Sequence, residues 1–535
     1  MRLCCIEAGK LNFKMKKSTK PIFHRLAPWL LAAMLFFVGF LPYLEAFRAQ
    51  DENHVFWGYL HYPEDMDSYA SWMTQSAKGA WLFSNPYQTS PRKGEYFNAL
   101  WLVAGKLQGL SGLDFAVMFQ ILRFAAALAL VMSFWFLLRA LDFEFRDRIG
   151  LSLLFCFAGG FGWLHTTLAF DAPIVDTYTE LFPFFQTTLV PHAALAHAVL
   201  LAAFGYFLLG KKTGSTQYYV LAGMSLFALG CFRAYDLLVA WLACGLALAL
   251  WSIWKTSRPS RKHMAWVMLP AIPCLMYNAW LSRYSSGFSI WSKTNDYPAP
   301  SPEIMALGLG LPLILGIAGV VWLILKKRFN VETLFLFAWL STGLILMFSG
   351  IVPWSWRTCA AFTTPYFIAC GLLLKNRLNS LKSAALWGLL LILTIPSSIE
   401  VLNEKFNLAF EQDRYYFQAP EILEAIRWLD QNRPEAIVLT HGHISLKIPA
   451  FSSARVLLGH KDLTEDFRKK RMDYHTIVNS YEPEKVSAML NRYGVDTILW
   501  GPLDRRYGNF SPASMPEWTK IYRNPLVSIY GKIKQ

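Results

Sequence analysis

Several carboxylates follow the first long apolar segment of the chain, in a stretch from about residue 48 to residue 114. Asp51 and Glu52 come directly after the apolar segment, and the sequence Pro63-Glu-Asp-Met-Asp-Ser-Tyr69 follows. A carboxylate held against an acceptor hydroxyl can act as a general base when its neighbours tune its pKa. If the transferred group leaves a phosphate, nearby cations or a metal ion offset the charge that develops there. The stretch therefore carries residues suited to group transfer from a phosphate.

Asp67 is the predicted catalytic base of this stretch. It lies one turn from the aromatic face of a helix that we expect over the residues that follow it. Asp51 and Glu52 are the alternative catalytic carboxylates. Each of these groups, and likewise Glu64 and Asp65, has a simpler alternative role, which is to keep the loop solvated.

Ionisable groups in other outer connections are predicted to share this surface. Polar side chains at membrane depth are energetically costly, so they are functional candidates by default. A guanidinium group such as that of Arg357 can hold a lipid phosphate through charge-assisted hydrogen bonds, or it can extend to the lipid headgroups instead. The predicted substrate-binding residues are Arg357, His192, Arg233, Asp236, Tyr69, Lys293 and Asn295.

Most of these candidates also have a structural alternative. Arg233 and Asp236 stand three residues apart and can pair with each other. His192 stands at the start of an apolar segment, where an interfacial histidine is an ordinary feature. Lys293 and Asn295 lie in a loop, where water alone can satisfy them.

Motifs for other chemistries are weak or missing. His441 and His443 follow a predicted strand, but no cysteine or third histidine completes a recognised metal-binding spacing. We therefore predict no protein metal site, while a divalent metal ion is a candidate cofactor beside a leaving phosphate. The chain has no P-loop, Rossmann fingerprint, nucleophile elbow or HExxH motif, which argues against an ATP-driven pump, a soluble nucleotide-sugar enzyme and a zinc protease.

The elements that must position these residues are mostly membrane helices. Apolar residues make up 54% of the 535-residue chain and charged residues 16%, and the mean hydropathy is +0.30. Soluble domains average about 25% charged residues. A segment of about 20 apolar residues is long enough to span a bilayer. Eleven such segments are predicted, with centres near residues 37, 126, 158, 200, 225, 244, 274, 314, 342, 366 and 391.

The basic residues predict an orientation. They cluster between the apolar segments, and two predicted segments separate each cluster from the next. All clusters then lie on one side of the membrane, which the positive-inside rule makes the cytoplasmic side. Residues 1–25 are therefore a cytoplasmic basic N-terminus, residues 26–400 a transmembrane domain, and residues 401–535 an extracytoplasmic domain. The net charge of +15 belongs to this pattern, which argues against nucleic-acid binding.

Both ends of the chain carry further signals. Met15 opens a short basic stretch before the first apolar segment, so the first fourteen residues are a candidate upstream extension. The segment from Leu26 to Phe47 is too long for a signal-peptide core and lacks a small-x-small cleavage site, which predicts an uncleaved first span. None of the eight cysteines falls after residue 370, so the C-terminal domain must fold on its apolar core.

After about Val401 the pattern changes to that of a small α/β domain. Apolar residues at helical spacing predict helices at 420–432 and 482–493. Short apolar runs predict strands at 436–440, 495–500 and 526–533. Strands that alternate with helices are typical of an α/β domain.

This layout resembles the GT-C superfamily, which comprises polytopic glycosyltransferases that use polyprenyl-phosphate-linked sugars. The superfamily includes protein mannosyltransferase-like and aminoarabinose transferase-like enzymes, which share the acidic first outer loop, the many spans and the outer C-terminal domain. The local features are similar to those of uncharacterised bacterial members. They are Asp67-Ser-Tyr69 with Met73, Gly159-Gly-Phe-Gly-Trp163, Phe182-Pro-Phe with Pro191-His192, Tyr235-Asp236 and the helix at 420–432.

The resemblance implies an α-helical polytopic membrane protein of about eleven transmembrane helices with a small C-terminal α/β domain. It implies that Asp67, or else Asp51 or Glu52, is the loop carboxylate and that Arg357 contacts the phosphate. The chain departs from better-known members in one respect, because the small and aromatic pattern does not follow the acidic pair at once.

The implied function is transfer of a sugar from a polyprenyl-phosphate donor to an envelope glycan, lipid or protein acceptor. The reaction would take place at the outer face of a bacterial inner membrane, with the donor and membrane lipids as partners. Two alternatives are a transporter or flippase of lipid-linked glycans and a non-catalytic envelope assembly protein.

Overall fold

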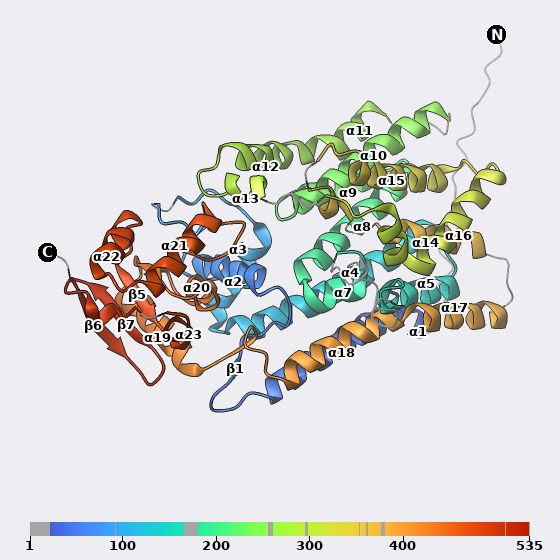
Figure 1. The fold of residues 1–535 in the computed structure, drawn as a ribbon. Coiled ribbons are helices and arrows are strands. Elements are labelled where there is room, and N and C mark those ends of the chain that lie inside the picture. The colour runs from blue at the N-terminus through green and yellow to red at the C-terminus, as the bar shows by residue number, and fades with distance from the viewer. Residues whose placement is uncertain are drawn as a thin grey trace, which may run out of the picture.

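The computed structural model describes a helical bundle with a small mixed sheet beside one end (Figure 1). It covers residues 22–90, 93–164, 180–254, 260–294, 298–352, 354–359, 362–375, 380–508 and 510–533. Asn295, Met15 and most of the predicted N-terminal segment 1–25 lie outside these residues.

Seven helices in the described part of the chain are long and apolar enough to cross a membrane. They are α1 (Ile22–Arg48), α4 (Phe115–Ala140), α8 (Pro191–Thr213), α10 (Ala234–Ile253), α11 with α12 (Arg261–Met268 and Ile272–Tyr284), α14 (Pro302–Leu325) and α15 (Val331–Phe348). The helices α17 (Ser380–Thr394) and α18 (Pro396–Phe410) form a pair bent by 44°, which makes an eighth crossing if the pair is one span. The protein is therefore an integral membrane protein, as its sequence predicts.

The predicted number of eleven spans is not confirmed. Seven predicted centres fall in the seven long apolar helices, and the centre near residue 391 falls in the bent pair. The remaining three centres lie in or at the end of shorter helices. These are α5 (Phe145–Phe157), α9 (Thr216–Gly230) and α16 (Thr364–Leu374).

Several basic turns between the helices meet at one end of the bundle. Lys212, at the end of α8, forms ion pairs with Asp142 at 2.7 Å and with Glu332 at 2.6 Å. Lys375, just after α16, donates a hydrogen bond to the carbonyl oxygen of Leu141. These contacts join turns whose basic clusters are predicted to share one side of the membrane.

Glycines allow the chain to pack against a broken helix inside the bundle. Helix α14 is interrupted at Gly310, whose φ of +56° is a value that L side chains rarely adopt. The segment after α5 packs at this break, where a Cβ on Gly160 would lie 1.9 Å from the carbonyl oxygen of Gly308. The N–H of Phe161 donates to the carbonyl of Leu307 across the same contact, so exposed backbone groups at the break gain a partner.

A five-stranded sheet forms the centre of the C-terminal region. Its order is β4-β3-β5-β7-β6, in which β4, β3 and β5 are parallel and β7 is antiparallel to both of its neighbours. The strands are β3 (Ile437–Leu439), β4 (Arg455–Val456), β5 (Thr497–Trp500), β6 (Trp518–Arg523) and β7 (Ser528–Lys532). The helices of this region are α19 (Pro420–Asn432), α20 (Gly442–Phe451), α21 (Phe467–Asn479), α22 (Pro483–Arg492) and α23 (Pro502–Tyr507).

The predicted α/β region is confirmed, with additional elements. The predicted helices correspond to α19 and α22, and the predicted strands to β3, β5 and β7. Strand β6 was not predicted, because half of its side chains are exposed and it has no apolar run. The predicted boundary at residue 401 falls inside α18, which packs along α1 (Figure 1).

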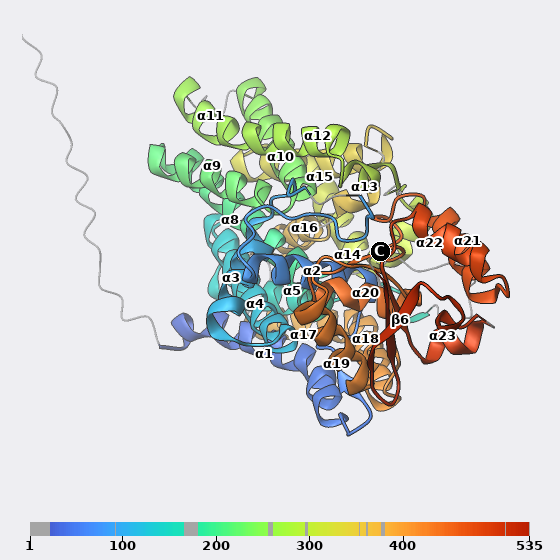
Figure 2. The same cartoon turned by 90° about the vertical axis from the view of Figure 1, so that its left-hand side faces the viewer.

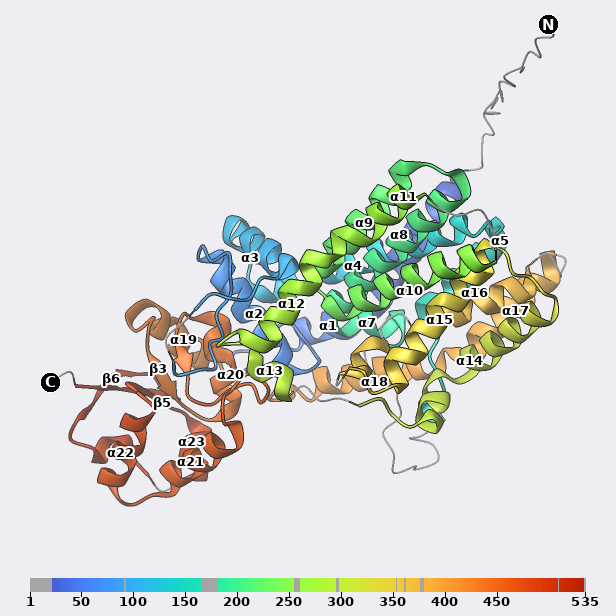
Figure 3. The same ribbon diagram turned by 90° about the horizontal axis from the view of Figure 1, so that it is seen from above.

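Helix α2 (Pro63–Ala77) joins the bundle to the C-terminal region. It packs against both α3 (Ala99–Ser111) and α20 (Figures 2 and 3). Between α2 and α20, the carboxylate of Asp67 pairs with Nζ of Lys447 at 2.9 Å, and both side chains are at most 3% exposed. The hydroxyl of Tyr59 donates to Asp67 and accepts from Lys447.

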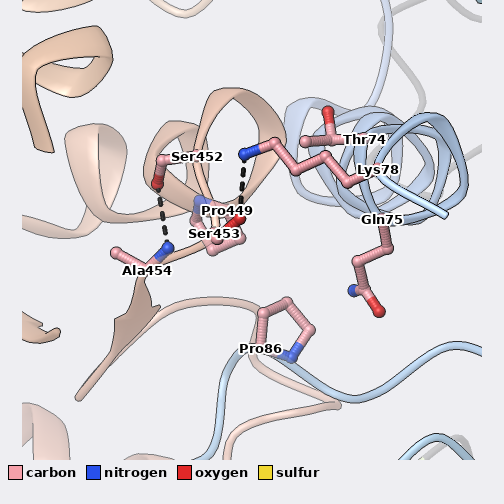
Figure 4. Close-up of a pocket in the computed structure, with 8 residues that line it drawn as sticks. All are labelled: Thr74, Gln75, Lys78, Pro86, Pro449, Ser452, Ser453 and Ala454. Carbon is pink, nitrogen blue, oxygen red and sulfur yellow. Dashed lines mark hydrogen bonds between the residues drawn. The ribbon is translucent and has the colours of Figure 1, made fainter. Parts of the chain in front are cut away.

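Further contacts fix the other end of α2. Lys78, just after the helix, donates to the hydroxyl of Ser453 at 2.8 Å (Figure 4) and pairs with Asp430 of α19 at 2.5 Å. The hydroxyl of Thr74 donates to the carbonyl of Ala450 at 2.6 Å. The short strands β1 (Val55–Phe56) and β2 (Phe417–Gln418) also pair, so the segment between α1 and α4 contacts the C-terminal region at several points.

Lys447→Met should destabilise the contact between α2 and α20, because it leaves the buried carboxylate of Asp67 without its charged partner. When one partner of a buried ion pair is removed, the free energy of unfolding falls by about 3–5 kcal/mol. Thermal unfolding of the purified protein in detergent measures this loss. The double variant Asp67→Asn/Lys447→Met removes both charges and should recover most of the stability. A Lys447→Met protein as stable as the wild type would contradict a stabilising role for the pair.

Candidate functional site

A cavity of about 450 Å³ lies where the bundle meets the C-terminal region. Residues of α2, α3, α12 and the first turns of α8 and α10 line it, together with residues near Trp354 and His460. Helix α8 runs from this cavity to the basic turn at Lys212, so the cavity and the basic turns lie at opposite ends of the bundle.

One face of α2 points into the cavity. Asp65, Ser68, Tyr69 and Trp72 line it, because helix residues three and four positions apart share a face. Asp67 is two positions from Asp65 and therefore lies on the other side of the helix, against α20. Asp65 also stands in the first turn of α2, where the helix dipole favours a negative charge.

The carboxylate of Asp65 is ionised and held by a histidine. Nε2 of His460 lies 3.2 Å from Oδ1 of Asp65, and 36% of the Asp65 side chain is accessible because it faces the cavity. Burial alone raises the pKa of Asp65, but its hydrogen bond with His460 and the charge of Arg357 lower this pKa to about 2. Asp65 therefore carries a negative charge at any physiological pH.

Two guanidinium groups share one buried carboxylate at the cavity wall. Glu180 pairs with Arg233 at 2.7 Å and with Arg357 at 3.1 Å. Arg233 also pairs with Asp236 at 2.5 Å, so two carboxylates balance its positive charge. Burial raises the pKa of Glu180, but the two arginines outweigh burial and lower it. Arg357 is 28% exposed, which leaves part of its guanidinium accessible from the cavity.

Aromatic rings form much of the remaining wall. The Tyr69 ring stacks on Trp101 with a centroid distance of 4.5 Å, and its hydroxyl lies 3.4 Å from Nε2 of His192. Tyr235 contacts Trp354 edge-on at 4.8 Å. Pockets that combine apolar walls with a few charged groups are typical of sites for small organic ligands.

The structure brings together several of the predicted site residues. Tyr69, His192, Arg233 and Arg357 line the cavity, and Asp236 lies behind them against Arg233. These residues come from four separate parts of the chain, and their sequence predicted that they share one surface.

Other predicted residues lie elsewhere. Asp67 is buried with Lys447 on the far side of α2. Asp51 bonds to His54 and Gln412, and both Asp51 and Glu52 are exposed. Lys293, on α13 (Ser289–Thr294), is exposed and does not line the cavity, and Asn295 lies outside the described residues.

Three charged groups at the cavity were not predicted as site residues. Asp65 could have been found from the spacing of Asp65, Ser68, Tyr69 and Trp72, which places a carboxylate on the same helix face as aromatic rings. Glu180 and His460 carry no such signal, because only the fold brings them to the cavity from distant parts of the chain.

The charged groups that the structure describes at the cavity pair with one another. Among the described residues, no group of three or more His, Cys, Asp or Glu side chains could hold a metal ion. The two carboxylates that line the cavity, Asp65 and Glu180, are already paired with His460 and with arginines. The arrangement can instead hold an anion at Arg357 beside the ionised carboxylate of Asp65.

Comparison with known proteins identifies the fold. No protein-family model and no curated protein matches the chain. Arabinofuranosyltransferase AftD from Mycobacteria matches with a TM-score of 0.55 at 14% identity, over 96% of this chain and 40% of the mycobacterial chain. The oligosaccharyltransferase of Archaeoglobus fulgidus, tethered to an acceptor peptide, matches with a TM-score of 0.49 at 12% identity, over 90% of this chain and 70% of that chain. The likeness to AftD shows that the two chains share a fold.

Glu180→Gln should destabilise the end of the bundle at the cavity, because it removes the carboxylate that Arg233 and Arg357 share. Removing one partner of a buried ion pair lowers the free energy of unfolding by about 3–5 kcal/mol. The control is Asp51→Asn, because Asp51 is 48% exposed and its partner His54 is 44% exposed. Exposed pairs contribute about 0–1 kcal/mol, so thermal unfolding in detergent should separate the two variants. Equal melting temperatures would contradict the assigned role of Glu180.

Proposed function

We propose that the protein is a GT-C-type membrane glycosyltransferase that moves a sugar from a polyprenyl-phosphate donor to an envelope glycan, lipid or protein acceptor. The observation that carries the proposal is that an ionised carboxylate, Asp65, and a partly exposed arginine, Arg357, line the same cavity of a GT-C-like fold. The shared fold by itself identifies no substrate.

In this proposal, Asp65 is the general base. Its carboxylate accepts the proton of an acceptor hydroxyl while the hydroxyl oxygen bonds to the anomeric carbon of the sugar. The bond between that carbon and the phosphate oxygen breaks, and polyprenyl phosphate leaves with the electron pair. Arg357 stabilises the charge on the phosphate through charge-assisted hydrogen bonds.

Binding of the donor should also strengthen the base. Arg357 contributes to the low pKa of Asp65, which makes the free carboxylate a weak base. A phosphate bound at Arg357 cancels part of that positive charge, so the pKa of Asp65 rises when the donor is present. The aromatic wall around Tyr235 and Trp354 offers apolar surfaces for the sugar ring.

We also propose that the N-terminus is cytoplasmic and that the cavity opens on the outer side of a bacterial inner membrane. The basic turns that meet near Lys212 support this orientation, because basic loops are retained in the cytoplasm. The cavity is at the opposite end of α8. The donor and acceptor would then meet outside the cytoplasm.

A flippase for lipid-linked glycans is the second candidate. The break of α14 at Gly310 favours it, since interrupted helices are typical of transporters. Vesicles that contain the protein and a labelled lipid-linked sugar distinguish the two functions. A flippase moves the lipid between leaflets without releasing polyprenyl phosphate, whereas a transferase releases it.

Asp65→Asn should reduce transfer by about 10²- to 10⁴-fold, because a general base contributes that much to the rate. The assay measures release of polyprenyl phosphate from a panel of polyprenyl-phosphate sugars, with envelope lipids and glycans as acceptors. Wild-type activity in a correctly inserted Asp65→Asn protein would refute Asp65 as the base.

The double variant Asp67→Asn/Lys447→Met tests the carboxylate on the other face of α2. It removes the Asp67 carboxylate without leaving a buried charge unpaired. If Asp67 acts only by holding α2 in place, the double variant should keep most of the transfer activity. If Asp67 is the base, as the sequence predicts, the double variant should be as inactive as Asp67→Asn alone.

Arg357→Ala should weaken binding of polyprenyl phosphate by about 10- to 100-fold, because a hydrogen bond to a charged group contributes about 1.5–3 kcal/mol. Binding is measured in nanodiscs with polyprenyl phosphate, and polyprenol serves as the uncharged ligand. The matched control is Lys293→Ala, since Lys293 is an exposed cation outside the cavity. Equal losses for both variants would contradict a phosphate site at Arg357.

A further inference from the structure

A short turn of the C-terminal region carries His460 into the cavity. The amides of Leu463 and Thr464 donate to the carbonyl oxygen of His460 at 3.2 and 2.9 Å, and the N–H of Gly459 donates to the hydroxyl of Thr464. The turn packs tightly on the first outer loop, because a Cβ on Gly459 would lie 2.2 Å from the ring of Tyr87. His460 is only 4% exposed, so its position is fixed by the turn and by the loop.

The hydrogen bonds of His460 determine where its proton lies. The N–H of Asp462 donates to Nδ1 at 3.0 Å, so Nδ1 presents a lone pair and carries no proton. The proton of the neutral imidazole is therefore on Nε2, which lies 3.2 Å from Oδ1 of Asp65 and donates to it. His460 is thus held as a hydrogen-bond donor that points at one carboxylate oxygen.

We propose that His460 positions Asp65 for proton transfer and keeps it ionised, so that the C-terminal region completes the catalytic site. This inference rests on the proposed function, in which Asp65 is the general base. A hydrogen bond to Oδ1 fixes the plane of the carboxylate and leaves Oδ2 to meet an acceptor hydroxyl in the cavity. His460 acts through Asp65 and is therefore a positioning residue.

The same contact controls the charge of Asp65. The hydrogen bond from His460 lowers the pKa of Asp65, while burial raises it. Removing His460 should therefore raise this pKa, and the base should be protonated over a wider range of acidic pH. The other charged or titratable groups near this pair are Glu64, Tyr69, Tyr87, His192, Arg357, Lys461 and Asp462.

The first experiment compares His460→Ala with His460→Gln by the release of polyprenyl phosphate from a polyprenyl-phosphate sugar. His460→Ala should lower kcat about 10- to 100-fold, since a small misplacement of a catalytic group has an effect of this size. The acid limb of kcat/KM should move to higher pH. His460→Gln keeps an amide N–H donor and should restore most of the activity. His475→Ala, which changes an exposed histidine of α21 outside the cavity, is the matched control.

The outcomes separate this inference from the proposed function. If His460→Ala lowers kcat without moving the acid limb, or if His460→Gln is as impaired as His460→Ala, then His460 has a merely structural role and the inference is wrong. If Asp65→Asn is inactive while His460→Ala behaves like the wild type, the inference alone fails. If Asp65→Asn is fully active, the proposed function fails first.

A second measurement does not depend on turnover. In protein labelled with ¹⁵N-histidine, the His460 signals are assigned by their loss in His460→Gln. The inference expects a neutral imidazole with its proton on Nε2, and a change of the Nε2 shift in Asp65→Asn. A proton on Nδ1, or signals that do not respond to Asp65→Asn, would overturn the assigned contact.

Discussion

The salt bridge between Asp67 and Lys447 holds α2 in one rotational setting, and the geometry of the cavity depends on that setting. Burial raises the pKa of Asp67 and lowers that of Lys447, so the protein environment opposes both charges. The pair persists because each group is the other's partner and Tyr59 bonds to both. With Asp67 fixed against α20, helical geometry places Asp65 and Tyr69 at the cavity.

Charge in the cavity is divided between two separate groups. Arg233 lies between Glu180 and Asp236 and is largely neutralised, whereas Arg357 pairs with Glu180 and remains partly exposed. Asp65 has its own partner in His460, which holds the carboxylate in place. An anion site and an ionised base can therefore coexist in one cavity, and a bound phosphate would couple them electrostatically.

The C-terminal region belongs to the site, although its sequence suggests a separate α/β domain. It pairs β2 with β1, holds Lys78 through Asp430 and Ser453, and supplies His460. Each contact joins it to the segment between α1 and α4, which carries Asp65 and Asp67. A loop of this length would be poorly ordered by itself, and packing against the sheet region gives it a fixed shape.

The sequence alone determined the elements that depend on local composition. Long apolar segments specified the membrane helices, and short apolar runs specified β3, β5 and β7, because burial in lipid or in a core demands apolar side chains. The tertiary structure decided which carboxylate reaches the cavity and what holds it there. Asp65 and His460 are 395 residues apart, and Glu180 and Arg357 are 177 apart, so no local pattern encodes either contact. Pairs so distant in sequence become neighbours only when helices and sheet pack against one another.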